Sequence, residues 1–264
     1  MKKGIYDGCF PSSLTLPERF ALAREAGFDG IEVTGTEDLI NSDEKLHELR
    51  ELSRSTVAVC SVMSQAGWGS AASPDPAEQA RGVGVLTKTF RAASILGADT
   101  VLIIPAVVTE QIRYEQAWER GIEATRRLGK IAEEYGVHIA LENVGNPFLL
   151  SPLEMRQFID EVGHPLVKCY LDVGNTLYNF GYPEHWIETL GSRIQKVHVK
   201  NFRTRTRTFP THLLDGDVNW PAVVAALRKV GYDDYLTAEV GTYKHFPRKG
   251  IYDHAESIGE IIRL

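Results

Sequence analysis

Short runs of apolar and β-branched residues alternate with longer stretches of helical periodicity along the whole chain. Most of the short runs are apolar at every position, which is typical of strands that are covered on both faces. Eight runs are therefore predicted to be strands: 4–8, 29–33, 57–63, 100–106, 137–143, 167–173, 194–200 and 235–240.

The stretches between these strands carry helix start and stop signals. Thr15 and Glu18 have the spacing of a capping box, in which each residue bonds to the backbone of the other. Ser151 and Glu154 repeat this pattern in SPLEMRQFIDEVG. In the last segment, DHAESIGEIIRL, Asp253 is the predicted N-cap.

Strand–helix alternation repeated eight times predicts a (β/α)8 TIM barrel, and 264 residues is a typical length for one. The structural alternative is an open, doubly wound sheet, which favours a G-x-G-x-x-G turn after its first strand. The segment GIYDGCFPSS lacks that pattern. No linker or second domain is visible, so we expect one TIM-barrel domain over residues 1–264.

Composition narrows the class of protein further. The net charge of −6 disfavours a nucleic-acid binder, and no apolar run is long enough for a membrane span. The lysines at the N-terminus are not followed by the apolar region of a signal peptide. Three scattered cysteines do not make a disulfide framework, so a cytoplasmic location is expected.

Four of the predicted strands carry a charged or ionisable group at or near their carboxyl ends. Strand 137–143 carries Glu142, and the next three strands carry Asp172, His198 and Glu239. Barrel enzymes place their chemistry at this end of the strands. We therefore expect three carboxylates and one imidazole to point at a single place.

Three buried carboxylates repel one another unless a cation lies between them. A divalent metal ion resolves this conflict, and the donor set of three oxygens and one nitrogen favours a hard ion. Manganese is the first expectation because it accepts both imidazole and carboxylate ligands, and magnesium, cobalt and zinc remain alternatives. Taken singly, a glutamate at a strand end is most often a surface or ion-paired residue, so the prediction depends on the coincidence of four.

Five ordered motifs carry a family resemblance: LEN at 141–143, YLDVGN at 170–175, HVKN at 198–201, DGDVNW at 215–220 and AEV at 238–240. Together they resemble the sugar isomerase/epimerase superfamily of xylose-isomerase-like TIM barrels. The ketose 3-epimerases of this superfamily use Glu, Asp, His and Glu as metal ligands in this order. The resemblance implies that Glu142, Asp172, His198 and Glu239 bind the metal, and that Glu142 and Glu239 are also the acid/base pair.

The resemblance leaves the substrate open. Free-ketose epimerases commonly have a histidine three residues after the metal-binding aspartate, and this chain has Asn175 there. The D-V-G-N form is closer to the ketopentose-phosphate branch. The loop after strand 57–63 lacks the histidine expected in that branch and offers Ser64, Gln65 and Trp68. A related isomerase, dehydratase or lyase acting on an inositol derivative or keto-sugar is the alternative.

Other residues are candidates for binding a small carbohydrate, free or phosphorylated. Lys200, Arg203, Arg205 and Arg207 follow strand 194–200 and match the chemistry of anion recognition. A solvated basic loop is the simpler alternative. Tyr6 and Trp68 are candidate pocket walls, and Asn175 a candidate polar contact.

Glu32 ends a strand on the active side of the predicted barrel. Its carboxylate is expected to hold a substrate hydroxyl or a neighbouring side chain, or else to form a structural ion pair with lysine or arginine.

Two other classes of protein, a nuclease and a non-catalytic binding protein, fit the sequence less well than a sugar epimerase. Endonuclease IV shares the barrel but needs three zinc ions and several more histidines, whereas only His198 lies at a predicted strand end. A carbohydrate-binding barrel without activity has no use for two acidic groups facing a metal. Pairing into homo-oligomers through apolar helix faces is expected only by analogy with other barrels.

Overall fold

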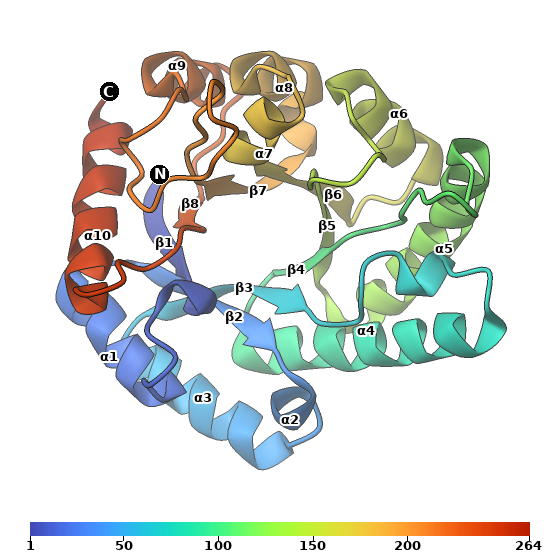
Figure 1. Cartoon of the computed structure of the whole chain (residues 1–264). Coiled ribbons are helices and arrows are strands. Elements are labelled where there is room, and N and C mark those ends of the chain that lie inside the picture. Colours follow the sequence, from blue (N-terminus) through green and yellow to red (C-terminus); the bar gives the residue numbers. More distant parts are fainter.

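The computed structural model describes all 264 residues and confirms the (β/α)8 barrel. Eight parallel strands pair in chain order, and β8 closes the ring against β1 (Figure 1). The strands are β1 Lys2–Tyr6, β2 Gly30–Gly35, β3 Ala58–Ser64, β4 Thr100–Ile103, β5 His138–Glu142, β6 Val167–Asp172, β7 Ile194–Val199 and β8 Tyr235–Ala238.

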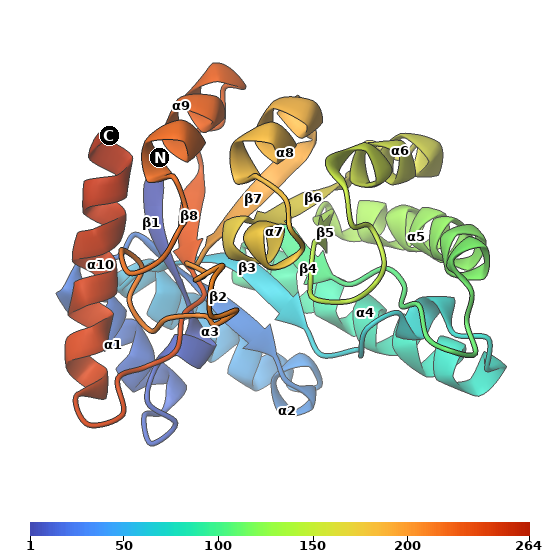
Figure 2. The ribbon, with the colours of Figure 1, turned by 45° about the horizontal axis from the view of Figure 1, so that its top comes forward.

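Helices form a ring outside the barrel, as Figure 2 shows from a tilted direction. They are α1 Leu16–Ala26, α2 Glu37–Ile40, α3 Asp43–Ser55, α4 Pro76–Leu96, α5 Tyr114–Tyr135, α6 Pro152–Val162, α7 Val173–Tyr178, α8 Pro183–Leu190, α9 Trp220–Lys229 and α10 Pro247–Arg263. Short 3-10 turns lie at Asp7–Cys9, Ser70–Ala72 and Gly191–Arg193. No helix is both long and apolar enough to cross a membrane.

Local capping fixes the start of several helices. The capping boxes predicted at Thr15 with Glu18 and at Ser151 with Glu154 are both present. The predicted N-cap at Asp253 is wrong, because α10 begins six residues earlier at Pro247. Asp253 lies inside that helix and pairs with Lys249 one turn before it, so its side chain stabilises the helix interior.

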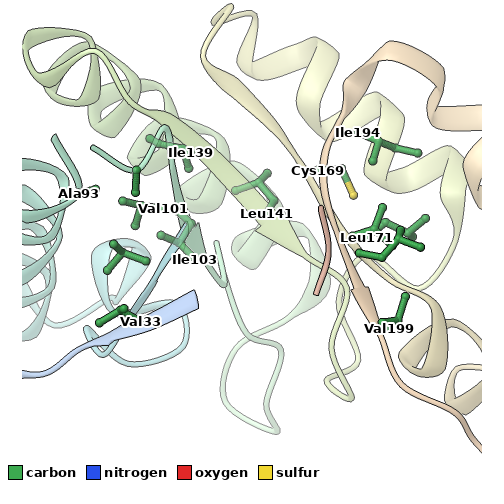
Figure 3. Close-up of a cluster of buried hydrophobic side chains, with 14 of the residues drawn as sticks. Val33, Ala93, Val101, Ile103, Ile139, Leu141, Cys169, Leu171, Ile194 and Val199 are labelled. Carbon is green, nitrogen blue, oxygen red and sulfur yellow. The ribbon is translucent and has the colours of Figure 1, made fainter. Parts of the chain in front are cut away.

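The main core lies between the strands and the helices. Alternate residues of a strand face opposite sides, so Ile139 and Leu141 of β5 pack outward in a cluster of 67 buried residues. Figure 3 shows part of this cluster. Ala140 between them faces inward with Leu102 and Tyr170. The same alternation turns Glu142, the last residue of β5, into the barrel mouth.

Candidate metal centre

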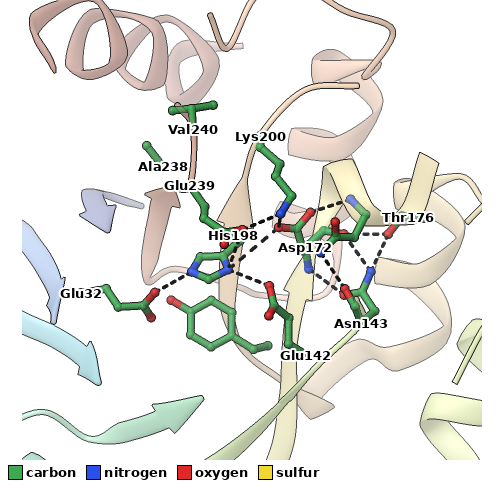
Figure 4. A network of polar contacts seen from close by, with 12 residues as sticks. Glu32, Glu142, Asn143, Asp172, Thr176, His198, Lys200, Ala238, Glu239 and Val240 are labelled. Atoms are coloured by element: carbon green, nitrogen blue, oxygen red, sulfur yellow. Dashed lines mark hydrogen bonds and ion pairs between the residues drawn. The ribbon is translucent and has the colours of Figure 1, made fainter. Parts of the chain in front are cut away.

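The structure brings the four predicted ligands together at the carboxyl ends of adjacent strands (Figure 4). Glu142 ends β5, Asp172 ends β6, His198 lies in β7, and Glu239 directly follows β8. One donor atom from each residue lies within 4.8 Å of the others. This spacing matches a cluster that can share one metal ion.

The two carboxylate oxygens of Asp172 have different surroundings. Its Oδ1 accepts a hydrogen bond from the backbone N–H of Asn175 at 2.6 Å, which caps α7. Asn143 clamps the backbone of the same residue, at 2.8 Å to its N–H and 2.9 Å to its carbonyl. The other oxygen, Oδ2, is buried and accepts no well-aligned hydrogen bond; its charge partner is the Lys200 ammonium, 3.1 Å away. One lysine does not satisfy both lone pairs of this oxygen, so Oδ2 can also bind a metal ion.

His198 is held between two glutamates at the centre of the site. Its Nδ1 lies 2.9 Å from Glu142 Oε1, and its Nε2 lies 2.8 Å from Glu32 Oε1. Glu32 is fully buried, and its second oxygen accepts a hydrogen bond from Ser61 at 2.6 Å. A carboxylate behind a histidine ligand fixes the ring and its tautomer. Glu32 therefore holds a neighbouring side chain, His198, which is one of the alternatives expected for it.

The charges of the site are unbalanced without a metal ion. Burial, together with the Glu239 carboxylate, raises the pKa of Glu142. Burial raises the pKa of Asp172 to about 7, although Lys200 opposes the rise. Burial also opposes the charge on His198, but Glu32 and Glu239 hold its pKa well above the ordinary value. A divalent cation would let all three carboxylates of the ligand set ionise together.

Lys200 is the only cation of the chain that lines the cavity above this site. Its ammonium lies 2.6 Å from Glu239 Oε2 and 3.1 Å from Asp172 Oδ2. Burial opposes the charge, but Asp172 and Glu239 hold the pKa of Lys200 above its usual range. The lysine therefore stays charged against two of the candidate metal ligands.

A cavity of about 250 Å³ is lined by two of the four candidate ligands, Glu142 and Glu239. Three residues predicted to contact substrate line it: Trp68, Asn175 and Lys200. The side-chain amide of Asn175 donates to the carbonyl of Asn143 at 2.9 Å, which fixes its orientation. Met63, Leu102 and Ile104 make much of the remaining wall apolar.

The other predicted substrate residues do not line this cavity. Tyr6 has its hydroxyl 3.2 Å from the Thr34 hydroxyl, and burial raises its pKa to about 12. Arg203 forms an ion pair with Asp215, and Arg205 is exposed. The expectation that these arginines reach the substrate finds no support in their positions.

Arg207 has a structural role in the same loop. Its guanidinium stacks at 4.4 Å over the ring of Phe180 and at 5.0 Å over that of Tyr178. It also donates a hydrogen bond to the carbonyl of Tyr178 at 2.9 Å. These contacts hold the β7–α9 loop against the end of α7 and the residues that follow it.

Sequence reasoning missed the roles of two buried polar residues. Asn143 directly follows Glu142 in the sequence, but its side chain bonds to the backbone of Asp172 on the neighbouring strand and so orients Asp172. Ser61 supports Glu32 and lies 3.2 Å from the Tyr170 hydroxyl. A serine within the apolar run VAVCSVM was the available signal for Ser61, but its partner lies 29 residues away.

Residues 20–260 match the family described as Xylose isomerase-like TIM barrel. The chain belongs to this family. The fold, the ordered motifs and the position of the ligand cluster all agree with that assignment.

Curated relatives of the chain include sugar epimerases and isomerases. "Putative L-ribulose-5-phosphate 3-epimerase SgbU" of Escherichia coli K12 is 26% identical over 91% of this chain and 89% of the relative. D-psicose 3-epimerase of Ruminiclostridium cellulolyticum is 24% identical over 90% of this chain and 83% of the relative. Inosose isomerase of Bacillus velezensis is 30% identical over 55% of this chain and 54% of the relative.

Solved structures show the same fold at lower identity. D-psicose 3-epimerase of Clostridium cellulolyticum H10, solved with D-tagatose, superposes with a TM-score of 0.85 at 21% identity, covering 100% of this chain and 98% of that one. The IOLI protein, solved with a zinc atom, also has a TM-score of 0.85, at 19% identity, over 99% and 98% of the two chains.

Proposed function

We propose that this protein is a divalent-metal-dependent 3-epimerase of a ketose or ketose phosphate. The observation that carries the proposal is the pair of glutamates, Glu142 and Glu239. They come from strands separated by β6 and β7, border one cavity, and share a possible metal cluster with Asp172 and His198. The similarity to two kinds of ketose 3-epimerase supports the same reaction type.

The residues present fit a metal ion. The buried Asp172 Oδ2 accepts no well-aligned hydrogen bond and has only the Lys200 ammonium nearby, at 3.1 Å, and the donor set of three carboxylates and one imidazole suits a hard divalent ion. Glu142, Asp172, His198 and Glu239 would hold it, with manganese the first choice and magnesium, cobalt or zinc the alternatives. When bound, the ion would stabilise the negative charge that develops on the substrate carbonyl oxygen.

The two glutamates would move the proton. One carboxylate removes the proton from the carbon beside the carbonyl, and the other returns a proton to the opposite face, which inverts that carbon. Positioned acid–base groups of this kind typically contribute about 10²–10⁴-fold to the rate. Lys200, whose ammonium contacts Glu239 at 2.6 Å, would hold a substrate oxygen at the cavity wall. Three unpaired thiols, Cys9, Cys60 and Cys169, fit the cytoplasm as the proposed location.

A second candidate function uses the same residues. If the proton returns to the neighbouring carbon, the product is an isomer of the sugar, and loss of a hydroxyl instead makes the reaction a dehydration. The local similarity to inosose isomerase, 30% identical over 160 residues, and to an inosose dehydratase, 25% identical over 122 residues, favours an inositol derivative as the alternative substrate.

Hydrogen exchange in D₂O tests the proposal without knowledge of the product. Manganese-loaded protein is incubated with free and phosphorylated ketoses, and proton NMR follows the signal of the carbon beside the carbonyl. We expect exchange that stops when the metal is chelated, and epimerisation, followed in the same spectra, that is lost in the Glu142→Gln and Glu239→Gln variants because each lacks the group on one face. Glu123→Gln, an exposed residue of α5, is the matched control.

Two other outcomes would contradict parts of the proposal. Normal epimerisation in either active-site variant would refute the acid/base assignment. Absence of exchange with every ketose, in protein shown to hold metal, would transfer the proposal to inositol derivatives or keto-glycosides.

A further inference from the structure

Arg120 of α5 is the only half-buried arginine with no intramolecular partner for its guanidinium. Its Nε atom is buried and has no acceptor. The other arginines that are not exposed all donate to backbone oxygens or carboxylates: Arg19, Arg50, Arg91, Arg193 and Arg203. A buried N–H group without an acceptor is costly, so an anionic ligand that accepts from Nε would stabilise this side chain.

Arg120 borders a small cavity of about 110 Å³ beside the candidate active site. The cavity lies between α5 and the segments that follow β3 and β4, a region on the opposite side of the barrel mouth from the β7–α9 loop (Figure 1). Trp68 and Ser70 line both this cavity and the larger one above the metal ligands. The two cavities are therefore adjacent, with Trp68 and Ser70 at their common border.

The charge around the small cavity favours an anion. Glu78 is its only acidic lining residue. That carboxylate is already paired with Arg81, whose Nε and Nη2 donate to it at 2.8 Å and 2.6 Å. One carboxylate with two guanidinium groups leaves one uncompensated positive charge, and this charge lies on Arg120.

We propose that Arg120 binds the phosphate of a phosphorylated ketose whose carbonyl end occupies the metal centre. This rests on the proposed epimerase function and selects the phosphorylated substrate class. The guanidinium presents paired N–H donors that match phosphate oxygens. The larger cavity holds the sugar carbons, and the smaller one holds the anionic group at the far end. The anion site thus lies beside α5, away from Arg203 and Arg205.

The test compares each ketose with its own phosphate ester. Exchange in D₂O gives kcat/KM for, for example, a ketopentose and its 5-phosphate with wild-type protein and with Arg120→Gln, Arg120→Lys and Arg127→Gln. Arg127 is exposed on the same helix and has no partner, so it is the matched control. Wild-type protein should prefer the phosphate ester. Arg120→Gln should reduce that preference by about 10–100-fold, the usual range for hydrogen bonds to charged groups, and Arg120→Lys should reduce it less.

Two results would overturn the assignment of Arg120. One is a wild-type protein with no preference for the phosphate ester. The other is an Arg120→Gln variant that loses activity equally on both sugars, because that indicates a purely structural role.

Binding of inorganic phosphate separates this inference from the proposed function. Calorimetry on metal-free protein should detect phosphate binding that Arg120→Gln weakens at least about tenfold and Arg127→Gln leaves intact. If no ketose exchanges, the epimerase proposal fails, and this measurement still decides the anion site. Equal phosphate affinity in wild-type and Arg120→Gln protein would refute it.

Discussion

Replacing Glu32 by glutamine keeps the shape of the side chain and removes the charge behind His198. In the structure, the Glu32 carboxylate lies 2.8 Å from His198 Nε2 and accepts from the Ser61 hydroxyl at 2.6 Å. A carboxamide has only one acceptor oxygen. One of the two donors therefore loses its acceptor in a site where Glu32 and His198 are both 0% exposed.

The cost of this loss can be estimated. A buried donor without an acceptor costs about 1–3 kcal/mol, and loss of the group that orients a histidine ligand weakens metal binding about 10–100-fold. The second range corresponds to about 1.4–2.8 kcal/mol, since each tenfold is about 1.4 kcal/mol. Both estimates agree, so we expect the Kd for manganese to rise about 10–100-fold in Glu32→Gln.

Electron paramagnetic resonance of free Mn²⁺ measures this Kd directly, and a thermal melt confirms that each variant is folded. Glu123→Gln serves as the control, because that residue is exposed on α5. A folded Glu32→Gln protein with wild-type manganese affinity would refute the argument that Glu32 orients His198 as a ligand.

Four further predictions concern the residues of the candidate metal site. Glu142→Gln and Glu239→Gln should each lower the rate of epimerisation by about 10²–10⁴-fold, as measured by NMR at saturating metal. Lys200→Met should tighten manganese binding, because the ammonium lies 3.1 Å from Asp172 Oδ2 and repels a second cation; a weaker affinity in titration would contradict this. Burial raises the pKa of Asp172 to about 7, so protons compete with the metal at low pH, and manganese affinity should rise as the pH passes through about 7. For the same reason, the contribution of Asp172 to the stability of metal-free protein is present below pH 4 and lost as the pH rises towards 7. Thermal melts between pH 4 and 8 should show the melting temperature of metal-free protein falling over this range, and added manganese should restore it.

The barrel and the ligand cluster could be predicted because both depend on short-range patterns that repeat. Uniformly apolar runs marked the strands, and parallel strands in chain order necessarily bring their carboxyl ends together. Glu142 and Glu239, 97 residues apart in the sequence, therefore met at the positions that their strands implied. No knowledge of side-chain partners was needed for this step.

The partners themselves could not be read from the sequence. Arg203 is bound by Asp215 and Glu32 by His198, 166 residues away, and neither pairing leaves a local signal. Asp253 had the spacing of a cap, yet the longer α10 placed it in a helix interior. The first strand was predicted at 4–8 and found at Lys2–Tyr6, because Asp7 turns away into a 3-10 turn and accepts from the Thr34 backbone at 3.0 Å.

The two halves of the barrel contribute differently to the cavities. All four candidate ligands lie in or directly after β5–β8, whereas β3, β4 and the segments that follow them supply most of the walls. The walls and the candidate ligands can therefore be altered separately. A graft of residues 64–73 from a relative should change which substrate is admitted and leave Glu142 and Glu239, the proposed proton-transfer groups, in place.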